Sequence, residues 1–205
     1  MEEIPFWEKE EQNHWWIAVV VVLLIILLIV RNQINNNRKQ QINTYILENL
    51  SAETQTWNGM MVGQTTEIEA EERLFELDHV RKSSITTIHT GNFTYINWSW
   101  KTSPSNVNSS IRFANGVVDR IILSFSDELT VDAVIDDFGF PDEVYVSPVG
   151  EPSEPIFWNL TLYYLEEGIN IGANSRRLKK TFSFSDEVQL IELFAPEQIT
   201  SAQDL

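Results

Sequence analysis

The sequence from Trp15 to Val30 reads Trp-Trp-Ile-Ala-Val-Val-Val-Val-Leu-Leu-Ile-Ile-Leu-Leu-Ile-Val, with no charged residue, glycine or proline. At ~1.5 Å per residue it makes a helix of roughly 24 Å, slightly shorter than the ~30 Å hydrocarbon core of a bilayer. Slight thinning of the bilayer makes up the difference, with Trp15 and Trp16 at one interface and Arg31 reaching toward the other. We therefore expect a transmembrane anchor over residues 15–30, bounded by Trp15, Trp16 and Val30.

Two other interpretations of this stretch fit less well. A core helix that is apolar on every side needs a large protein around it, and the rest of this chain is too short. A cleaved signal peptide begins with a basic region and ends in small residues. Here residues 1–14 hold five glutamates against Lys9, and Val30 is followed by Arg-Asn-Gln-Ile. We expect an uncleaved single span behind an acidic tail of residues 1–14.

The composition of residues 31–205 limits the classes of partner. They hold thirteen Lys or Arg against twenty-five Asp or Glu, a formal charge of −12. We expect no nucleic-acid partner, because no basic stripe is present to neutralise phosphates. The chain has no cysteine, which excludes disulfides, thiolate metal sites and thiol nucleophiles. No cofactor is expected.

Two helical patterns follow the anchor at a fixed offset. Residues 31–56 are rich in Asn and Gln, with apolar residues at helical spacing, and predict a partly helical juxtamembrane stalk that ends near Asn58-Gly59. Thr66-x-x-Glu69 is a capping box that begins one helix. Sixty-four residues later, Thr130 begins a second helix, which Gly139 and Pro141 end. The apolar stripes of the two helices are Ala70, Leu74 and Leu77, and Val131, Val134, Ile135 and Phe138.

Strand patterns recur at the same offset. Residues 93–100 align with residues 157–164, and both segments alternate apolar and polar side chains. The predicted core face holds Ile96, Trp98, Trp100, Trp158, Leu160, Leu162 and Tyr164; the opposite face holds Phe93, Tyr95, Asn97, Ser99, Asn159, Thr161 and Tyr163.

Further strand patterns complete each copy. Asn115-Gly116 predicts a hairpin turn between two short strands. Its expected counterpart is Phe184 to Val188, offset by 71 residues because Glu166–Lys180 forms a longer excursion. Ser147–Pro155, with three prolines, is expected to be a loop.

The sequence therefore predicts an α+β protein. An N-terminal transmembrane helix is followed by two tandem helix-β-β-β repeats, at residues 57–126 and 127–205. The two repeats are expected to share one antiparallel sheet, with the helices on one face.

These features carry a family resemblance. A Thr-capped helix ending in Phe138-Gly-x-Pro141-Asp142-x-Val144, then an aromatic strand and a hairpin, resembles the bacterial envelope modules of the outer-membrane-assembly lipoprotein (SmpA/OmlA) type. Two in tandem resemble β-lactamase-inhibitor-protein-like domains and uncharacterised two-copy envelope proteins of green non-sulfur bacteria. The match covers about residues 57–195, and the first copy departs from it, with Phe75 for the glycine and Leu77 for the proline. The resemblance implies a continuous tandem sheet and a binding role, with the membrane helix replacing the lipidated cysteine of the lipoproteins.

No constellation of residues predicts a particular chemistry. His14, His79 and His89 share no metal-ligand spacing, so no metal site is expected. An acidic cluster around the second helix has ligands suited to Ca²⁺, but its spacing favours a solvated helix face. The cluster comprises Asp127, Glu128, Asp132, Asp136, Asp137, Asp142 and Glu143.

Two classes of function remain. The first is a membrane-anchored, non-catalytic interaction module of the bacterial cell envelope that binds a protein partner on the open face of the sheet. Its candidate binding residues are Phe93, Tyr95 and Tyr163, since aromatic side chains supply contact area at low entropic cost; ordinary cross-strand pairing explains them equally well. The alternative is an envelope hydrolase that uses a pair of acidic residues. No catalytic residue is identified.

The side of the membrane rests on two conflicting arguments. One basic residue precedes the span, and Arg31, Arg38 and Lys39 follow it within about fifteen residues, which places the C-terminal domain in the cytoplasm by the positive-inside rule. The resembling modules act outside the cytoplasm. We expect a single-pass protein of the plasma membrane with an extracytoplasmic domain.

Overall fold

The computed structural model describes residues 6–101, 108–125, 129–151, 154–175 and 182–195. The chain forms two units, Met1–Arg38 and Lys39–Leu205, and each is described by itself. The first helix, α1 (Phe6–Glu48), begins in the first unit and ends in the second. No glycine or proline interrupts it, so the polar stretch after Val30 continues the helix.

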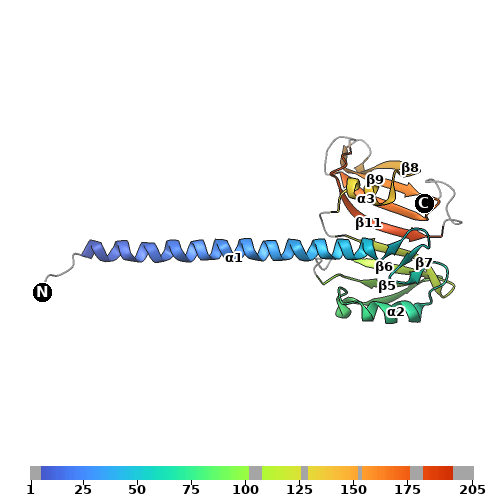
Figure 1. Ribbon diagram of the computed structural model, residues 1–205, viewed down its shortest axis with the longest axis horizontal. Coiled ribbons are helices and arrows are strands. Elements are labelled where there is room, and N and C mark those ends of the chain that lie inside the picture. The colour runs from blue at the N-terminus through green and yellow to red at the C-terminus, as the bar shows by residue number, and fades with distance from the viewer. Residues whose placement is uncertain (1–5, 102–107, 126–128, 152–153, 176–181, 196–205) are drawn as a thin grey trace. The chain divides into compact units, whose positions relative to one another are not determined.

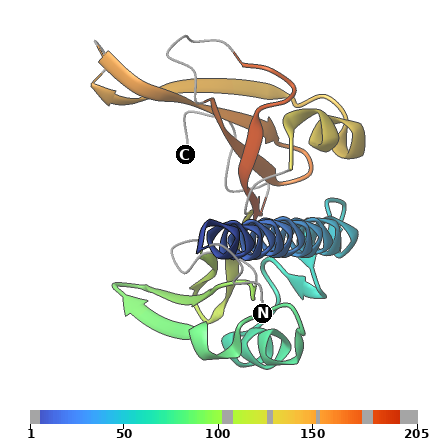
Figure 2. The same ribbon diagram turned by 90° about the vertical axis from the view of Figure 1, so that its left-hand side faces the viewer.

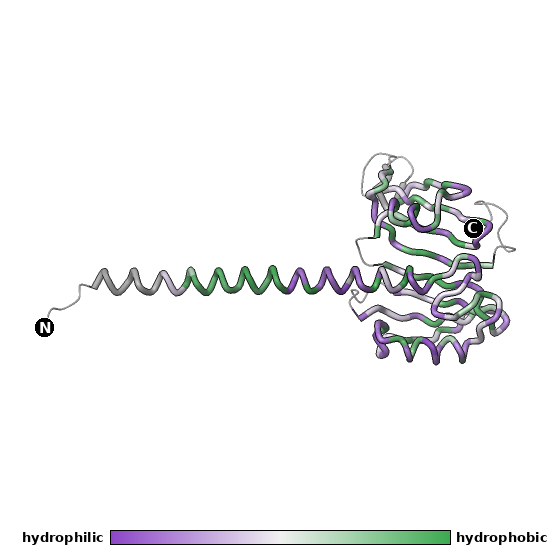
Figure 3. The backbone as a smooth tube through the Cα atoms, in the orientation of Figure 1, coloured by the Kyte–Doolittle hydropathy of each residue, from purple (hydrophilic) through white to green (hydrophobic). Residues whose placement is uncertain are grey.

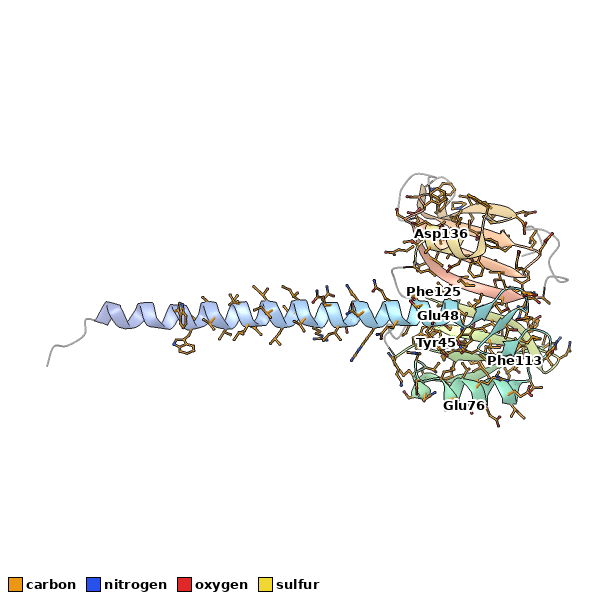
Figure 4. All side chains as sticks on the ribbon, viewed as in Figure 1. Tyr45, Glu48, Glu76, Phe113, Phe125 and Asp136 are labelled. Atoms are coloured by element: carbon orange, nitrogen blue, oxygen red, sulfur yellow. The ribbon has the colours of Figure 1, made fainter. Side chains whose placement is uncertain are left out.

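In the first unit, α1 exposes its apolar side chains. Trp15 is 66% exposed and Val30 is 45% exposed. Figure 3 shows the apolar stretch as a continuous green segment followed by polar turns, and side chains project from it on all sides in Figure 4. Of the described helices, α1 is the one that is long and apolar enough to cross a membrane, by length and composition. It suits a single membrane anchor or a signal sequence.

The second unit is an α+β fold built on an eight-stranded antiparallel sheet (Figure 1). The strand order is β4-β5-β6-β7-β11-β10-β9-β8. The first four strands are β4 (Thr86–Thr90), β5 (Phe93–Trp98), β6 (Ser109–Ala114) and β7 (Val117–Ser124). The other four are β8 (Glu143–Glu151), β9 (Glu154–Tyr164), β10 (Ile169–Ser175) and β11 (Glu187–Phe194).

Helix α2 (Glu67–Glu76) precedes β4–β7, and helix α3 (Val131–Phe138) precedes β8–β11. The predicted capping box is confirmed at α2: the Thr66 hydroxyl accepts from the Glu69 N–H at 3.4 Å, and the Glu69 carboxylate accepts from the Thr66 N–H at 2.9 Å. Gly139 ends α3 with a φ of 80°, which costs little without a Cβ. Each helix is followed by four strands, one more than the sequence predicts.

A small three-stranded antiparallel sheet completes the unit. It consists of β1 (Leu50–Ser51), β2 (Thr56–Trp57) and β3 (Met60–Met61), and a short 3-10 helix, η1 (Lys82–Ser84), precedes β4. Asn58 and Gly59 connect β2 to β3 with φ values of 49° and 72°, so this turn signal is confirmed as a hairpin.

One hydrophobic core lies on a single face of the large sheet. The predicted core residues Ile96, Trp98, Trp100, Leu160, Leu162 and Tyr164 are buried there, whereas Trp158 is half-buried. Ala70 and Leu74 of α2, Val131 and Val134 of α3, and Ile42 and Ile46 of α1 belong to the same core. The two repeat helices and the end of α1 therefore contribute to the same core, whereas the sequence led us to expect only the two repeat helices there.

Three indole rings form the densest part of this core. Trp57 stacks on Trp98 with ring centroids 5.7 Å apart, and Trp100 meets both rings edge-on at 5.7 and 6.0 Å. All three side chains are fully buried. Trp57 comes from the small sheet, so its ring ties that sheet to β5.

Three segments differ from the sequence-based expectation. Ser147–Pro155, predicted to be a loop, contains the end of β8 and the start of β9. Pro148 is tolerated there because β8 is an edge strand, where a missing N–H breaks no ladder. Glu166–Lys180, predicted to be an excursion, contains β10. Phe184 to Asp186 lie in the turn before β11, so they are not the counterpart of the first hairpin, which is confirmed at Asn115-Gly116.

The two halves of the sheet meet at one seam. β7 pairs antiparallel with β11, with Ser124 opposite Leu190 and Arg120 opposite Phe194. Figure 2 shows the green strands of the first half and the orange and red strands of the second. The seam gives the two halves a continuous ladder and a shared core.

Candidate binding face

The open face is the face of the large sheet opposite the helices. Polar residues cross it strand by strand: Glu192 on β11 lies opposite Asn170 on β10, and Asn170 lies opposite Tyr163 on β9. Strand periodicity places all three on the same side, because paired residues share a face. Their burial is unusual for a solvent-facing surface: Tyr163 is 4% exposed, Asn170 5% and Glu192 9%.

An ion pair crosses the seam at this point. The Nη1 of Arg120 on β7 lies 2.7 Å from Oε1 of Glu192. The Nδ2 of Asn170 donates to the other carboxylate oxygen of Glu192 at 2.6 Å. Both oxygens of this nearly buried carboxylate therefore have partners, which offsets much of the cost of removing its charge from water.

A β-bulge supplies a second ion pair beside the first. Asp119 is the extra residue between the pairs Arg112–Arg120 and Phe113–Val118, and such a bulge places two residues opposite one. The Nε of Arg112 donates to Asp119 Oδ2 at 2.5 Å, and the same carboxylate pairs with Arg112 Nη2. The opposed arginines Arg112 and Arg120 thus each have a carboxylate, which relieves the repulsion between like charges.

The open face is hollowed over β7, β11, β10, β9 and β8. The hollow has a volume of about 590 Å³, within the ~300–1,000 Å³ range of ligand sites. Its lining includes Arg120, Tyr145, Thr161, Tyr163, Gln189 and Glu192. Gln189 is itself the bulged residue of β11, between the pairs Gly172–Leu190 and Ala173–Val188.

Tyr163 forms part of the wall of this hollow. Burial raises the pKa of its hydroxyl above the ordinary value of 10.0; a hydrogen bond with Thr161 opposes this rise, and the nearby Glu192 carboxylate adds to it. The hydroxyl therefore stays neutral at physiological pH and can both donate and accept a hydrogen bond.

The structure separates the aromatic residues that the sequence singled out. Phe93 and Tyr95 lie on β5, and Tyr163 lies on β9, five strand positions away in the sheet order. At ~4.8 Å per strand that is roughly 24 Å. Phe93 is 38% exposed, and the Arg112 guanidinium lies 4.8 Å from its ring centroid. A binding role for the three residues stays a prediction, and they do not form one cluster.

Sequence reasoning missed Arg120 and Glu192. Glu192 lies between Ile191 and Leu193, and Arg120 follows Asp119 and precedes Ile121-Ile122. A charge inside an apolar strand is costly unless it is paired. The isolated charge of Glu192 was the available signal for a buried ion pair, but the identity of its partner needed the β7–β11 pairing.

The ion pair gives a stability prediction. We expect Glu192→Gln to lower the free energy of unfolding by about 2–3 kcal/mol, because the partly buried Arg120 guanidinium loses its anion. We expect the double variant Arg120→Leu, Glu192→Leu to cost much less, since it removes both charges. Urea denaturation of the two variants measures the difference. A double variant as unstable as the single one would contradict this account of the pair.

Across the described part of the chain, no three His, Cys, Asp or Glu side chains come together as metal ligands. Asp127 and Glu128 of the acidic cluster lie outside the described residues. Comparison with known proteins gives no match for this chain among protein-family models, curated proteins or solved structures.

Proposed function

We propose that this protein is a membrane-anchored, non-catalytic binding module of the bacterial cell envelope. The hollow of the open face is proposed to receive a protein partner. The observation that carries the proposal is the composition of that hollow: aliphatic, aromatic and neutral polar side chains line it, and its charged groups are paired with each other. Such a surface offers hydrogen bonds and aromatic contact area, and both are typical of surfaces that bind a partner.

The second support is the apolar part of α1. Its exposed Ile, Leu and Val side chains need an apolar environment, which a bilayer supplies. We propose a single-pass protein of the plasma membrane with its folded unit outside the cytoplasm. The resemblance to envelope modules supports that side, and the basic residues after the span oppose it.

We further infer that the two halves of the sheet are tandem copies of one unit. Val118, Ile121 and Leu123 of β7 recur seventy residues later as Val188, Ile191 and Leu193 of β11. The bulged residues Asp119 and Gln189 follow the same offset. Three shared side chains and a shared bulge support a common origin for the two halves.

The side of the membrane on which the folded unit lies is tested by labelling introduced cysteines. Because the chain has no cysteine, a single Ser183→Cys variant carries one thiol, in the turn before β11. An impermeant maleimide should label this thiol on intact cells, and should label a Glu3→Cys variant only after lysis. The reverse pattern would place the domain in the cytoplasm and direct the search to a cytoplasmic partner.

The binding role is tested by photocross-linking in cells. A photoreactive amino acid replaces Tyr145, which is 53% exposed and lines the hollow, or Ile68, which is 69% exposed on α2. We expect a discrete adduct from position 145 that disappears when Thr161→Trp fills the hollow. The same adducts from both positions, or an adduct that Thr161→Trp leaves unchanged, would rule out the hollow as the binding surface.

A further inference from the structure

The two edges of the large sheet differ in how they are protected. β8 carries Pro148, a bulge at Val149/Gly150, and the carboxylates of Glu143 and Glu151 in its sequence. β4 reads Thr-Thr-Ile-His-Thr, and all five residues are exposed. It has no proline, no acidic or basic residue other than a histidine, and no irregularity in its pairing with β5. Edge strands normally carry such protections because their free N–H and C=O groups accept another strand.

The register shows which groups of β4 are free. Gly91 and Asn92 form a two-residue turn, so the flanking pair Thr90–Phe93 is hydrogen-bonded. Hydrogen-bonded pairs alternate along an antiparallel ladder, which makes Ile88–Tyr95 the next one. The N–H and C=O groups of Thr87 and His89 therefore point away from β5. They form two donor and acceptor sets placed symmetrically about Ile88.

We propose that β4 pairs antiparallel with β4 of a second copy of this chain, about a two-fold axis at Ile88. Thr87 then lies opposite His89 of the second copy, and His89 lies opposite its Thr87. Both pairs exchange two hydrogen bonds, so all four outward groups of each strand are satisfied. The side chains of the two Ile88 residues meet at the axis, and each is 50% exposed in the single chain.

Charge separates the two edges of the sheet. The whole chain has a formal charge of −16, so copies repel each other over most of their surface. β4 carries no acidic or basic residue other than His89, so two β4 strands can pair without placing like charges opposite each other. Pairing at β8 would bring carboxylates together.

Because the contact between two β4 strands is small, their pairing depends on both copies being held in one membrane. A five-residue strand pair with four hydrogen bonds falls below the ~1,200 Å² of a stable soluble interface. Copies held in one bilayer, as the proposed anchor implies, meet at a much higher effective concentration. The pairing also requires an isologous interface, which closes at two copies and does not continue into a fibre.

The test is disulfide formation by the full chain in phosphatidylcholine vesicles. Since the chain has no cysteine, Ile88→Cys introduces the only thiol. Opposite residues in a non-hydrogen-bonded pair have Cα atoms ~4.5 Å apart, within the range of a disulfide. Tyr145→Cys is the matched control, because Tyr145 is 53% exposed on the other edge strand. After mild oxidation we expect several-fold more covalent dimer from Ile88→Cys than from Tyr145→Cys.

Two further measurements test the register. Thr87→Cys mixed with His89→Cys should cross-link more than either variant alone, because only the mixture places the two thiols opposite each other. Adding Thr87→Pro to Ile88→Cys removes an N–H that points away from β5, so the chain's own ladder remains and the cross-link should fall. Circular dichroism of this double variant checks its fold.

Three results would overturn the proposal. Cross-linking by Ile88→Cys no stronger than that by Tyr145→Cys shows that β4 does not pair with a second copy. Ile88→Cys paired preferentially with Tyr145→Cys indicates head-to-tail assembly through β8. A cross-link that survives Thr87→Pro unchanged shows that backbone pairing at β4 does not hold the copies together.

Discussion

Replacing Trp98 by alanine is expected to remove a large part of the stability of the second unit. The ring is fully buried, stacks on Trp57 and meets Trp100 edge-on, so its removal leaves a cavity between β5 and the small sheet. Large-to-small changes of this kind cost about 3–5 kcal/mol. A domain of this size has roughly 5–15 kcal/mol of stability in total.

The control lies on the same strand. Phe93 is 38% exposed and faces away from the core, so Phe93→Ala should cost about 1 kcal/mol or less, mainly from its contact with Arg112. Trp98→Phe should cost less than Trp98→Ala, because phenylalanine keeps an aromatic ring in the core and leaves a smaller cavity. Both substitutions remove the indole N–H, which is buried without a partner among the described residues. Urea denaturation of a fragment of residues 39–205 measures all three. Equal losses for Trp98→Ala and Phe93→Ala would mean that the faces of β5 are wrongly assigned.

A fragment that starts at residue 57 is expected to be far less stable than one that starts at residue 39. Residues 39–56 contribute Ile42, which is 4% exposed, and Ile46, which is fully buried. Tyr45 also donates a hydrogen bond to Asn58 Oδ1 at 2.7 Å (its position is labelled in Figure 4). Losing two buried isoleucines costs at least about 4 kcal/mol, since each truncation in a core costs about 2–5 kcal/mol.

Point variants in the longer fragment separate packing from chain length. Ile46→Ala should lower the free energy of unfolding by about 2–5 kcal/mol, and Thr44→Ala, at an exposed position on the same helix, by less than about 0.5 kcal/mol. Thermal melts followed by circular dichroism measure both. If the fragments starting at 39 and 57 melt at the same temperature, the end of α1 does not belong to the core.

The sequence predicted correctly those caps and turns that depend only on residues close together in the chain. The capping box at Thr66, the glycine stop at Gly139 and the Asn115-Gly116 turn each depend on a few neighbouring residues. The core face of β5 and β9 followed from strict alternation. The stripe of Ile42, Tyr45 and Ile46 was visible as a helix, but its burial depends on strands far along the chain.

The elements that were missed depend on long-range pairing. β10 contains Gly172 and two asparagines, which favour turns. A Cβ at position 172 would lie 3.1 Å from Leu190 Cγ, so a larger residue there would have to displace that side chain. β4 is exposed on both faces and so shows no alternation. The ion pair of Arg120 and Glu192 joins residues on β7 and β11, and no local pattern specifies that these two strands are neighbours.

The seam between β7 and β11 also sets an order of events during synthesis. Roughly sixty residues separate the end of β7 from the start of β11, and at ~5–20 residues per second they take several seconds to make. Until β11 arrives, β7 and β10 both remain unpaired edges on a nascent chain whose apolar helix has already been synthesised. The last strand to be synthesised therefore inserts between β7 and β10, in the middle of the sheet. Before β11 is made, the free edges of β7 and β10 can pair wrongly with another copy of the chain.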